Sequence, residues 1–162
     1  QHQRPQQPDR ITHRIGRLHY HVFMARSYHK AQRPLTSFPD LIAAGCLVPG
    51  LYLSQTRALS HAPAGITLLR DVNSVSTILS LCRAGFAPAL LPAHIQETNP
   101  DFIVQTDITV PALDIWLSYT ERARRIKRGE AIISWLKEIF SPSESSWFRQ
   151  TSHKHTPTPD NA

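Results

Sequence analysis

The sequence predicts an α/β protein, and the order of three segments carries this prediction. Apolar runs at residues 66–72 and 86–91 have the length of strands, and a helical pattern at 75–82 lies between them. A strand, a helix and a strand in this order imply parallel pairing with a crossover helix, and therefore a layered α/β architecture. The chain has 162 residues, 41% of them hydrophobic, which is enough for one domain with a buried core.

Three short elements are expected at the start of this architecture. Apolar residues alternate with others over 18–25, which predicts a half-buried strand. A helical turn over 28–32 ends before Pro34, because the residue before a proline avoids helical angles. A second short helix over 39–44 ends at Gly45.

The next stretch is rich in turn residues. Residues 46–48 and 51–53 are expected to form short strands around a turn at Pro49 and Gly50. Residues 55–65 then form a loop that leads into the strand at 66–72.

The most regular helical pattern of the chain follows that strand. Asn73 or Ser74 is its natural cap, and Gly85 ends it before the strand at 86–91. Its apolar positions recur at i, i+3, i+4 and i+7, so they share one helix face: Val75, Ile78, Leu79 and Cys82.

The last ordered elements are expected to be two strands, at 102–105 and 113–119, and a helix of about four turns. That helix ends at Pro142 and has an apolar stripe made by Ile126, Ile132, Ile133, Leu136, Ile139 and Phe140. The two ends, 1–9 and 141–162, lack apolar periodicity and are expected to be disordered.

The charge and the cysteines narrow the possible partners. The net charge is +6, but the basic residues are spread out except in the run at 122–128. That run is either the solvated start of a helix or a contact for phosphate or a partner. Cys46 and Cys82 lie far apart in apolar segments, which indicates buried thiols and no disulfide. We expect no membrane span, because the longest apolar stretch, 41–53, is interrupted, and no secretory signal is in view.

We find no catalytic constellation or metal site in the sequence. His19 and His21 flank Tyr20, but no Cys, Asp or Glu lies near enough in sequence to complete a ligand set. No nucleophile elbow and no glycine-rich phosphate loop is present. The expected protein is therefore not an enzyme and needs no cofactor.

The candidate binding site lies where the strand at 66–72 meets the helix after it. Asp71, Asn73 and Ser74 converge there beside backbone N–H groups that have no helical partner. In open α/β sheets, ligands gather beyond the carboxyl ends of strands, where this junction lies. The alternative is that Asn73 and Ser74 only cap the helix.

The order of these elements resembles the effector-binding domain of LysR-type bacterial transcriptional regulators. Residues 82–92 (CRAGFAPALLP) resemble the A-G-x-G-x-x-x-L-P segment of that family. Upstream, 14–28 (RIGRLHYHVFMARSY) and 38–41 (FPDL) are similar to the passage from its first lobe into its second. Downstream, 114–119 (DIWLSY) and 132–140 (IISWLKEIF) resemble its return strand and closing helix.

The sequence departs from the family pattern at a few positions. Ala87 takes the place of the second glycine and Pro88 follows it, while Tyr28 and His29 stand where the family has Tyr-Leu. The family also begins with a winged helix-turn-helix, a linker helix and the first half of lobe one, of which no pattern is seen here. The resemblance thus implies a C-terminal fragment.

The resemblance implies a two-lobed fold of the periplasmic-binding-protein type II, incomplete, with lobe two and the C-terminal part of lobe one. The effector-binding domain is expected over 10–140, with lobe two at about 21–114 and the return to lobe one at 115–140. Asp71, Asn73 and Ser74 align with the effector-contacting edge of the cleft.

The expected function is to sense a small metabolite and thereby control transcription. The implied partners are that metabolite, further copies of the chain in a dimer or tetramer, and promoter DNA only through the missing N-terminal domain. A cytoplasmic location follows. The alternatives are an extracytoplasmic solute-binding protein of the same fold and, further off, a hydrolase or transferase.

Overall fold

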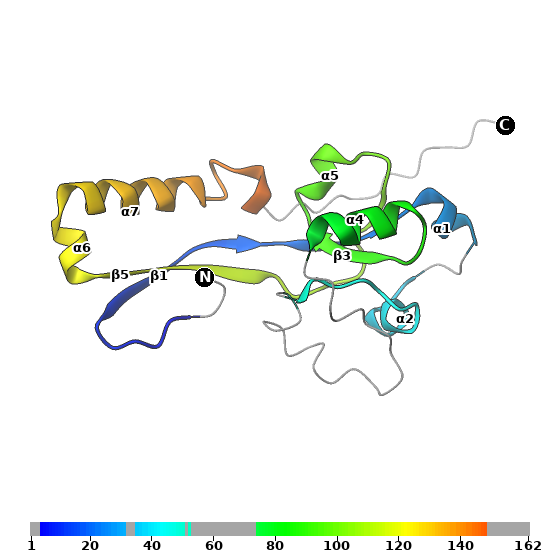
Figure 1. Ribbon diagram of the computed structural model, residues 1–162, viewed down its shortest axis with the longest axis horizontal. Helices are drawn as coiled ribbons and strands as arrows, with labels where there is room; N and C mark the ends of the chain where they lie inside the picture. Colours follow the sequence, from blue (N-terminus) through cyan, green and yellow to red (C-terminus); the bar gives the residue numbers. More distant parts are fainter. Residues whose placement is uncertain (1–3, 32–34, 51, 53–73, 149–162) are drawn as a thin grey trace.

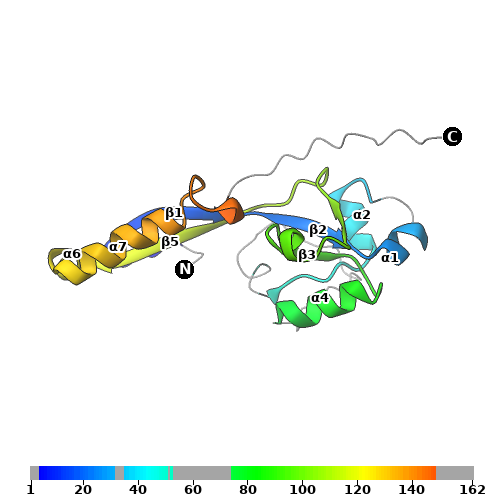
Figure 2. The same ribbon diagram turned by 90° about the horizontal axis from the view of Figure 1, so that it is seen from above.

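Figure 1 shows the computed structural model, which describes residues 4–31, 35–50, 52 and 74–148. The described chain forms two regions joined end to end, a rounded body and a long arm (Figures 1 and 2). We call the region from β2 to β4 the body, and the ribbon of β1 and β5 with α6 and α7 the arm.

The body is built on a three-stranded sheet of order β3-β2-β4. Its strands are β2 (Tyr20–Met24), β3 (Ala89–Pro92) and β4 (Ile103–Gln105), and both ladders are antiparallel. Because β2 lies in the middle, its backbone pairs on both edges, with Val22 opposite both Leu90 and Gln105.

Both faces of this sheet are covered. Tyr20, Val22 and Met24 belong to one buried cluster, whereas Phe23 belongs to another. Adjacent residues of a strand point to opposite faces, so β2 separates two half-cores. The sequence predicted a half-buried strand at 18–25, but the structure buries four consecutive residues, Val22 to Ala25, because both faces are packed.

Helices supply the two covers of the body, which also holds α1 (Arg26–Ala31) and α5 (Ile95–Thr98). Helix α4 (Val75–Arg83) contributes Ile78 and Cys82 to the cluster around Phe23. Helix α2 (Phe38–Ala43) contributes Leu41 to the cluster on the other face.

The ends of α2 and α4 explain why these segments are helical. Ser37 caps α2 by accepting a hydrogen bond from the backbone N–H of Asp40. Ser74 caps α4 in the same way, which confirms one of the two residues predicted for that role. Gly45 and Gly85 follow the two helices at φ of 72° and 76°, a conformation that favours glycine.

The arm is an antiparallel ribbon with helices along it. Strand β1 (Arg10–Leu18) pairs with β5 (Leu113–Thr120), and α6 (Glu121–Arg125) and α7 (Lys127–Ile139) follow β5. Helix α7 runs back along the ribbon toward the body (Figures 1 and 2). The sequence did not predict β1, because its residues show no alternation of apolar side chains.

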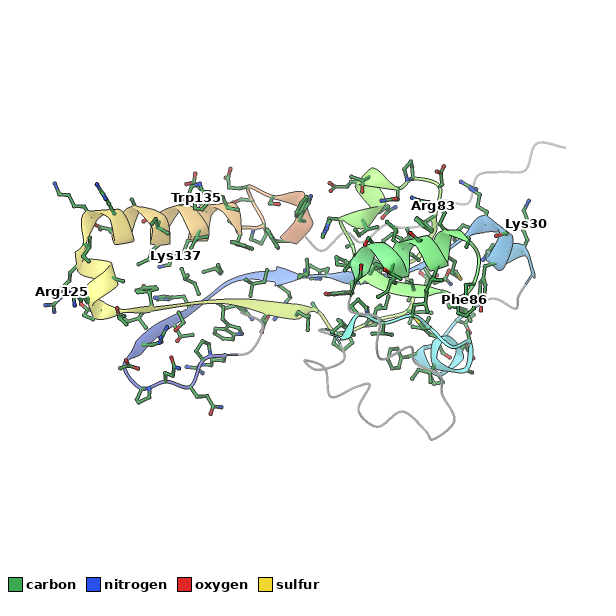
Figure 3. All side chains as sticks on the ribbon, in the orientation of Figure 1. Lys30, Arg83, Phe86, Arg125, Trp135 and Lys137 are labelled. Carbon is green, nitrogen blue, oxygen red and sulfur yellow. The ribbon has the colours of Figure 1, made fainter. Side chains whose placement is uncertain are left out.

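The basic run at 122–128 lies at the far tip of the arm, where Figure 3 labels Arg125. It forms α6 and the first turn of α7, in agreement with the helical interpretation of this run. Thr120 caps α6, and Glu121 pairs with Arg124 at 2.6 Å and with Arg125 at 3.3 Å. This pairing holds the pKa of Glu121 below its ordinary value.

Several predicted elements differ from the structure or lie outside the described residues. The strand predicted at 46–48 is reduced to a single parallel bridge between Leu47 and Ala89. The strand at 66–72 and the loop at 55–65 lie outside the described residues, so the expected parallel pairing of 66–72 does too. Of 51–53 only Tyr52 is described, as a buried residue of helical conformation.

Candidate functional site

Of the predicted site residues, the structure describes only Ser74. Asp71 and Asn73 lie outside the described residues. The Ser74 hydroxyl accepts a hydrogen bond from the Thr77 N–H at 3.3 Å and shares another with the Ser76 hydroxyl at 2.7 Å. Its oxygen thus caps α4 while the side chain remains exposed.

The start of α4 faces the arm. Figure 3 labels Arg83, the last residue of α4, and Phe86 on the side of the body away from the arm, so the opposite end of the helix lies toward it. The first N–H groups of a helix point out of its N-terminus and carry partial positive charge. Such groups can bind a polar or anionic ligand.

Two strand connections join the arm to the body. Only His19 separates β1 from β2, and β5 begins at Leu113. Leu18 pairs with Leu113, so the two connections lie side by side at one junction. Two neighbouring connections of this kind can act as a hinge between two lobes.

A third contact bridges this junction near the end of the described chain. The indole ring of Trp147 stacks on His94, with ring centroids 4.3 Å apart and planes 15° from parallel. Its Nε1–H donates to a carboxylate oxygen of Glu97 at 3.3 Å. Phe148 packs on Phe140, at the C-terminal end of α7. We call residues 141–148, which join α7 to this contact, the strap.

The strap was not anticipated from the sequence, which predicted a disordered tail from residue 141. In the structure residues 141–148 include a 3-10 helix, Ser146–Phe148, and Phe148 is buried. Two aromatic residues within an otherwise polar segment were the available signal. Burial lowers the pKa of His94 below its ordinary value, although Glu97 opposes this shift.

The titratable groups of the described chain do not assemble into a metal or thiol centre. No group of three or more His, Cys, Asp or Glu in that part of the chain could hold a metal ion. Cys46 and Cys82 are free and buried, as expected from the sequence. Burial raises the pKa of Cys82 to about 11, and that of Cys46 also rises, so neither is a thiolate at neutral pH. None of the described helices is long and apolar enough to cross a bilayer.

Comparisons with known proteins agree with this architecture. The family model described as the LysR substrate binding domain matches residues 2–141. No curated protein sequence matches the chain closely enough to count as a relative. The residues matched by the family model include the arm, the body and the start of α4.

Solved structures share the fold at low sequence identity. The regulatory domain of CrgA, a LysR-type regulator from Neisseria meningitidis, is 13% identical; the match covers 86% of this chain and 73% of that one, with a TM-score of 0.62. For the regulatory domain of AphB from Vibrio vulnificus the identity is 16%, the coverage 80% and 70%, and the TM-score 0.58. For reduced OxyR from N. meningitidis these values are 18%, 89% and 69%, and 0.56. The fold is therefore part of the two-lobed periplasmic-binding-protein type II architecture of these domains.

Proposed function

We propose that this chain, which belongs to the LysR substrate-binding domain family, senses a small metabolite for a transcriptional regulator. Domains of this family belong to non-enzymatic regulators, and we extend that to this chain. A cytoplasmic location, assembly into a dimer or tetramer, and promoter contact through a separate DNA-binding part are included in the proposal.

The observation that supports this role most directly is that the capped start of α4 is exposed and is the end of the helix nearer the arm (Figure 3). We propose that Asp71, Asn73 and Ser74 contact the effector there. The exposed cap at Ser74 can offer N–H groups as well as a hydroxyl. Asp71 disfavours an anionic group directly beside it, unless Arg70 or a residue of the arm compensates.

The effector would act by favouring one arrangement of body and arm over another. A ligand shifts such an equilibrium only by the difference in its affinity for the two states. The strap already links α7 to His94 and Glu97 across the same junction. An effector that moves the body relative to the arm would therefore also change this contact.

The test uses a full-length protein that contains this chain. A thermal-shift screen of polar and anionic metabolites identifies a ligand, whose affinity is then measured by calorimetry. Asn73→Ala should weaken binding by a few-fold to about a hundredfold, the range of one or two lost polar contacts. Promoter binding without the ligand should be retained.

Ser80→Ala is the matched control, because Ser80 is an exposed residue of α4 whose hydroxyl donates to the Ser76 carbonyl within the helix. It should leave the affinity unchanged. If a folded Asn73→Ala protein binds the same ligand with native affinity, Asn73 does not contact the effector and the proposed site is wrong.

A further inference from the structure

The positive charge of the described chain is concentrated in the arm. Strands β1 and β5 with helices α6 and α7 contain nine Lys and Arg against four Asp and Glu, whereas the described residues from β2 to β4 contain three of each kind. Five of the nine basic residues lie in the run at 122–128, at the tip of the arm, where Figure 3 labels Arg125. The excess charge therefore belongs to one end of the molecule.

Most of this charge at the tip is not neutralised. Glu121 pairs with Arg124 and Arg125, whose side chains remain 57% and 78% exposed, and Glu130 also acts on Arg124. In the part of the chain that the structure describes, the other three basic residues of the run are exposed and form no ion pair: Arg122, Lys127 and Arg128. Residues 121–130 contain five basic and two acidic residues, so the tip carries a net charge of +3.

Two of these cations stand where the helix itself disfavours them. Lys127 and Arg128 occupy the first turn of α7, a helix of 13 residues. The N-terminus of a helix carries partial positive charge, so acidic side chains are favoured there and basic ones are disfavoured. Arg124 and Arg125 lie at the negative end of α6, where they stabilise the helix, but folding gives no such reason for Lys127 and Arg128. Positions that break a local folding rule are often functional.

The two helices meet in a tight corner that keeps the cations together. A Cβ at Gly129 would overlap the backbone carbonyl of Ala123, so only glycine lets α7 start this close to α6. Thr120 caps α6 at the end of β5 and thereby fixes where the corner begins. Basic residues of both helices are therefore held at the same tip, at the far end of the arm from the body (Figures 1 and 3).

We propose that the arm tip contacts the phosphate backbone of double-stranded DNA without reading its sequence. A duplex carries about one negative charge per 1.7 Å of its axis, and four of the five basic residues are arginines, which pair with phosphate through two hydrogen bonds. Residues 121–130 contain no aromatic side chain on which the bases of a single strand could stack. The contact goes beyond the sensing role and would add to promoter binding through the separate DNA-binding part.

Fluorescence anisotropy of a labelled duplex, titrated with the 162-residue chain, tests this contact. At about 50 mM salt the dissociation constant should be about 1–100 µM, the range of non-specific DNA binding. About four phosphate contacts predict a loss of affinity of about a hundredfold between about 50 and 200 mM salt. Two duplexes of unrelated sequence should bind equally. No binding at the lower salt concentration, or a strong preference for one sequence, would overturn the proposal.

A matched pair of double variants locates the contact on the molecule. Lys127→Gln with Arg128→Gln should weaken binding at least tenfold and make its salt dependence shallower, because two phosphate contacts are lost. Arg26→Gln with Lys30→Gln removes the same charge from exposed positions of α1, at the opposite end of the molecule, and should change the affinity less than twofold (Figure 3). Circular dichroism checks that both variants are folded. Equal losses in the two would mean that only the overall charge attracts DNA, which contradicts the proposal.

Removal of an acidic residue at the tip should have the opposite effect. Glu121→Gln releases Arg124 and Arg125 from their ion pairs and should tighten binding several-fold. Glu138→Gln changes the net charge equally at an exposed position near the other end of α7 and should have less than a twofold effect. A purely structural role of Glu121 predicts weaker binding in its variant, so that result would count against a DNA contact.

A competitor distinguishes DNA from an acidic protein, because arginines also bind carboxylates. Poly-L-glutamate at the same concentration of negative charge should displace the labelled duplex at least tenfold less well than unlabelled duplex does. Equal displacement would assign the tip to an acidic polypeptide and overturn the proposal. Asn73→Ala should bind the duplex like the native chain, so failure of this contact and failure of the effector contacts give different results.

Discussion

The body and the arm both contain antiparallel strands, but they differ in how many layers cover those strands. In the body, Val22, Phe23 and Leu90 have no exposed surface, since clusters pack on both faces of the sheet. In the arm, α7 has no buried residue, although it carries an apolar stripe along its length. A complete set of layers, more than hydrophobic content, decides where a core forms.

Helix α7 shows this difference within one element. Ile133, Leu136 and Phe140 are half-buried, while Ile132 and Trp135 are 55% and 57% exposed. An amphipathic helix on a single ribbon buries only one stripe. The second apolar stripe of α7 therefore faces solvent in this chain.

The largest expected difference in the free energy of unfolding is between substitutions of one leucine from each region. Leu90→Ala should reduce the free energy of unfolding by about 2–5 kcal/mol, because it leaves a cavity in a fully packed site. Leu136→Ala should cost only about 1 kcal/mol, because the side chain is half-buried. Urea unfolding followed by circular dichroism measures both. Equal losses would show that the arm is packed as well as the body.

The next effect concerns the close contact between β1 and the end of α7 in the arm. Gly16→Val should destabilise the protein by about 1–3 kcal/mol, because its side chain meets the Phe140 backbone oxygen. Thr12→Val, elsewhere on β1 at a half-buried position, is the matched control and should be nearly neutral. Hydrogen exchange of the α7 amides should accelerate in Gly16→Val alone. An unchanged exchange rate would mean that α7 does not depend on this contact.

A smaller effect on stability, with a clear optical signal, comes from the exposed stripe. A dye that fluoresces on apolar surfaces should bind native protein, and Ile132→Gln combined with Trp135→Gln should reduce that signal strongly. The free energy of unfolding should change by no more than about 0.5 kcal/mol. Lys137→Gln is the control on the same helix. Dye binding that persists in the double variant would place the exposed apolar surface elsewhere.

The sequence was informative where local pattern determines structure and uninformative where distant contacts do. Helix α4 follows from spacing alone, as does most of α7, and Ser74 is one of the two caps between which the sequence did not decide. Strand β1 could not be recognised, because it is held by pairing with β5, whose residues lie 95 to 110 positions further along the chain. The effector roles of Asp71 and Asn73 stay predictions, since both lie outside the described residues.

Features that depend on such distant contacts were missed for the same reason. The register of β1 against β5 shifts between Arg14 and Gly16, and nothing in the sequence marks this shift. Trp147 and His94 come together because α7 returns along the arm (Figure 1). The polar residues of 141–148 predicted a disordered segment. In the structure, the ring contacts of Trp147 and Phe148 hold this segment in place.

The smallest expected effect tests whether the strap joins arm and body in solution. Burial against Trp147 disfavours the charged form of His94 and lowers its pKa. In Trp147→Ala the ring is exposed and Glu97 is released, and both changes favour the charged form, so the pKa should rise toward 6.5. An NMR titration of the His94 ring measures this shift directly.

The sign of the pH dependence follows from the direction of that shift. Because folding lowers the pKa of His94, the unfolded chain binds protons more readily, and the stability gained from the strap is complete only above pH 6.5. It should decline as the pH falls below 6.5 toward the folded pKa, by less than about 0.5 kcal/mol, because the ring is partly exposed and solvent screens its charge. Trp147→Phe keeps a stacked ring and loses only the hydrogen bond to Glu97, so its His94 pKa should stay closer to the native value. If His94 titrates identically in native protein and Trp147→Ala, the strap does not rest on the body, and only the two strand connections hold the regions together.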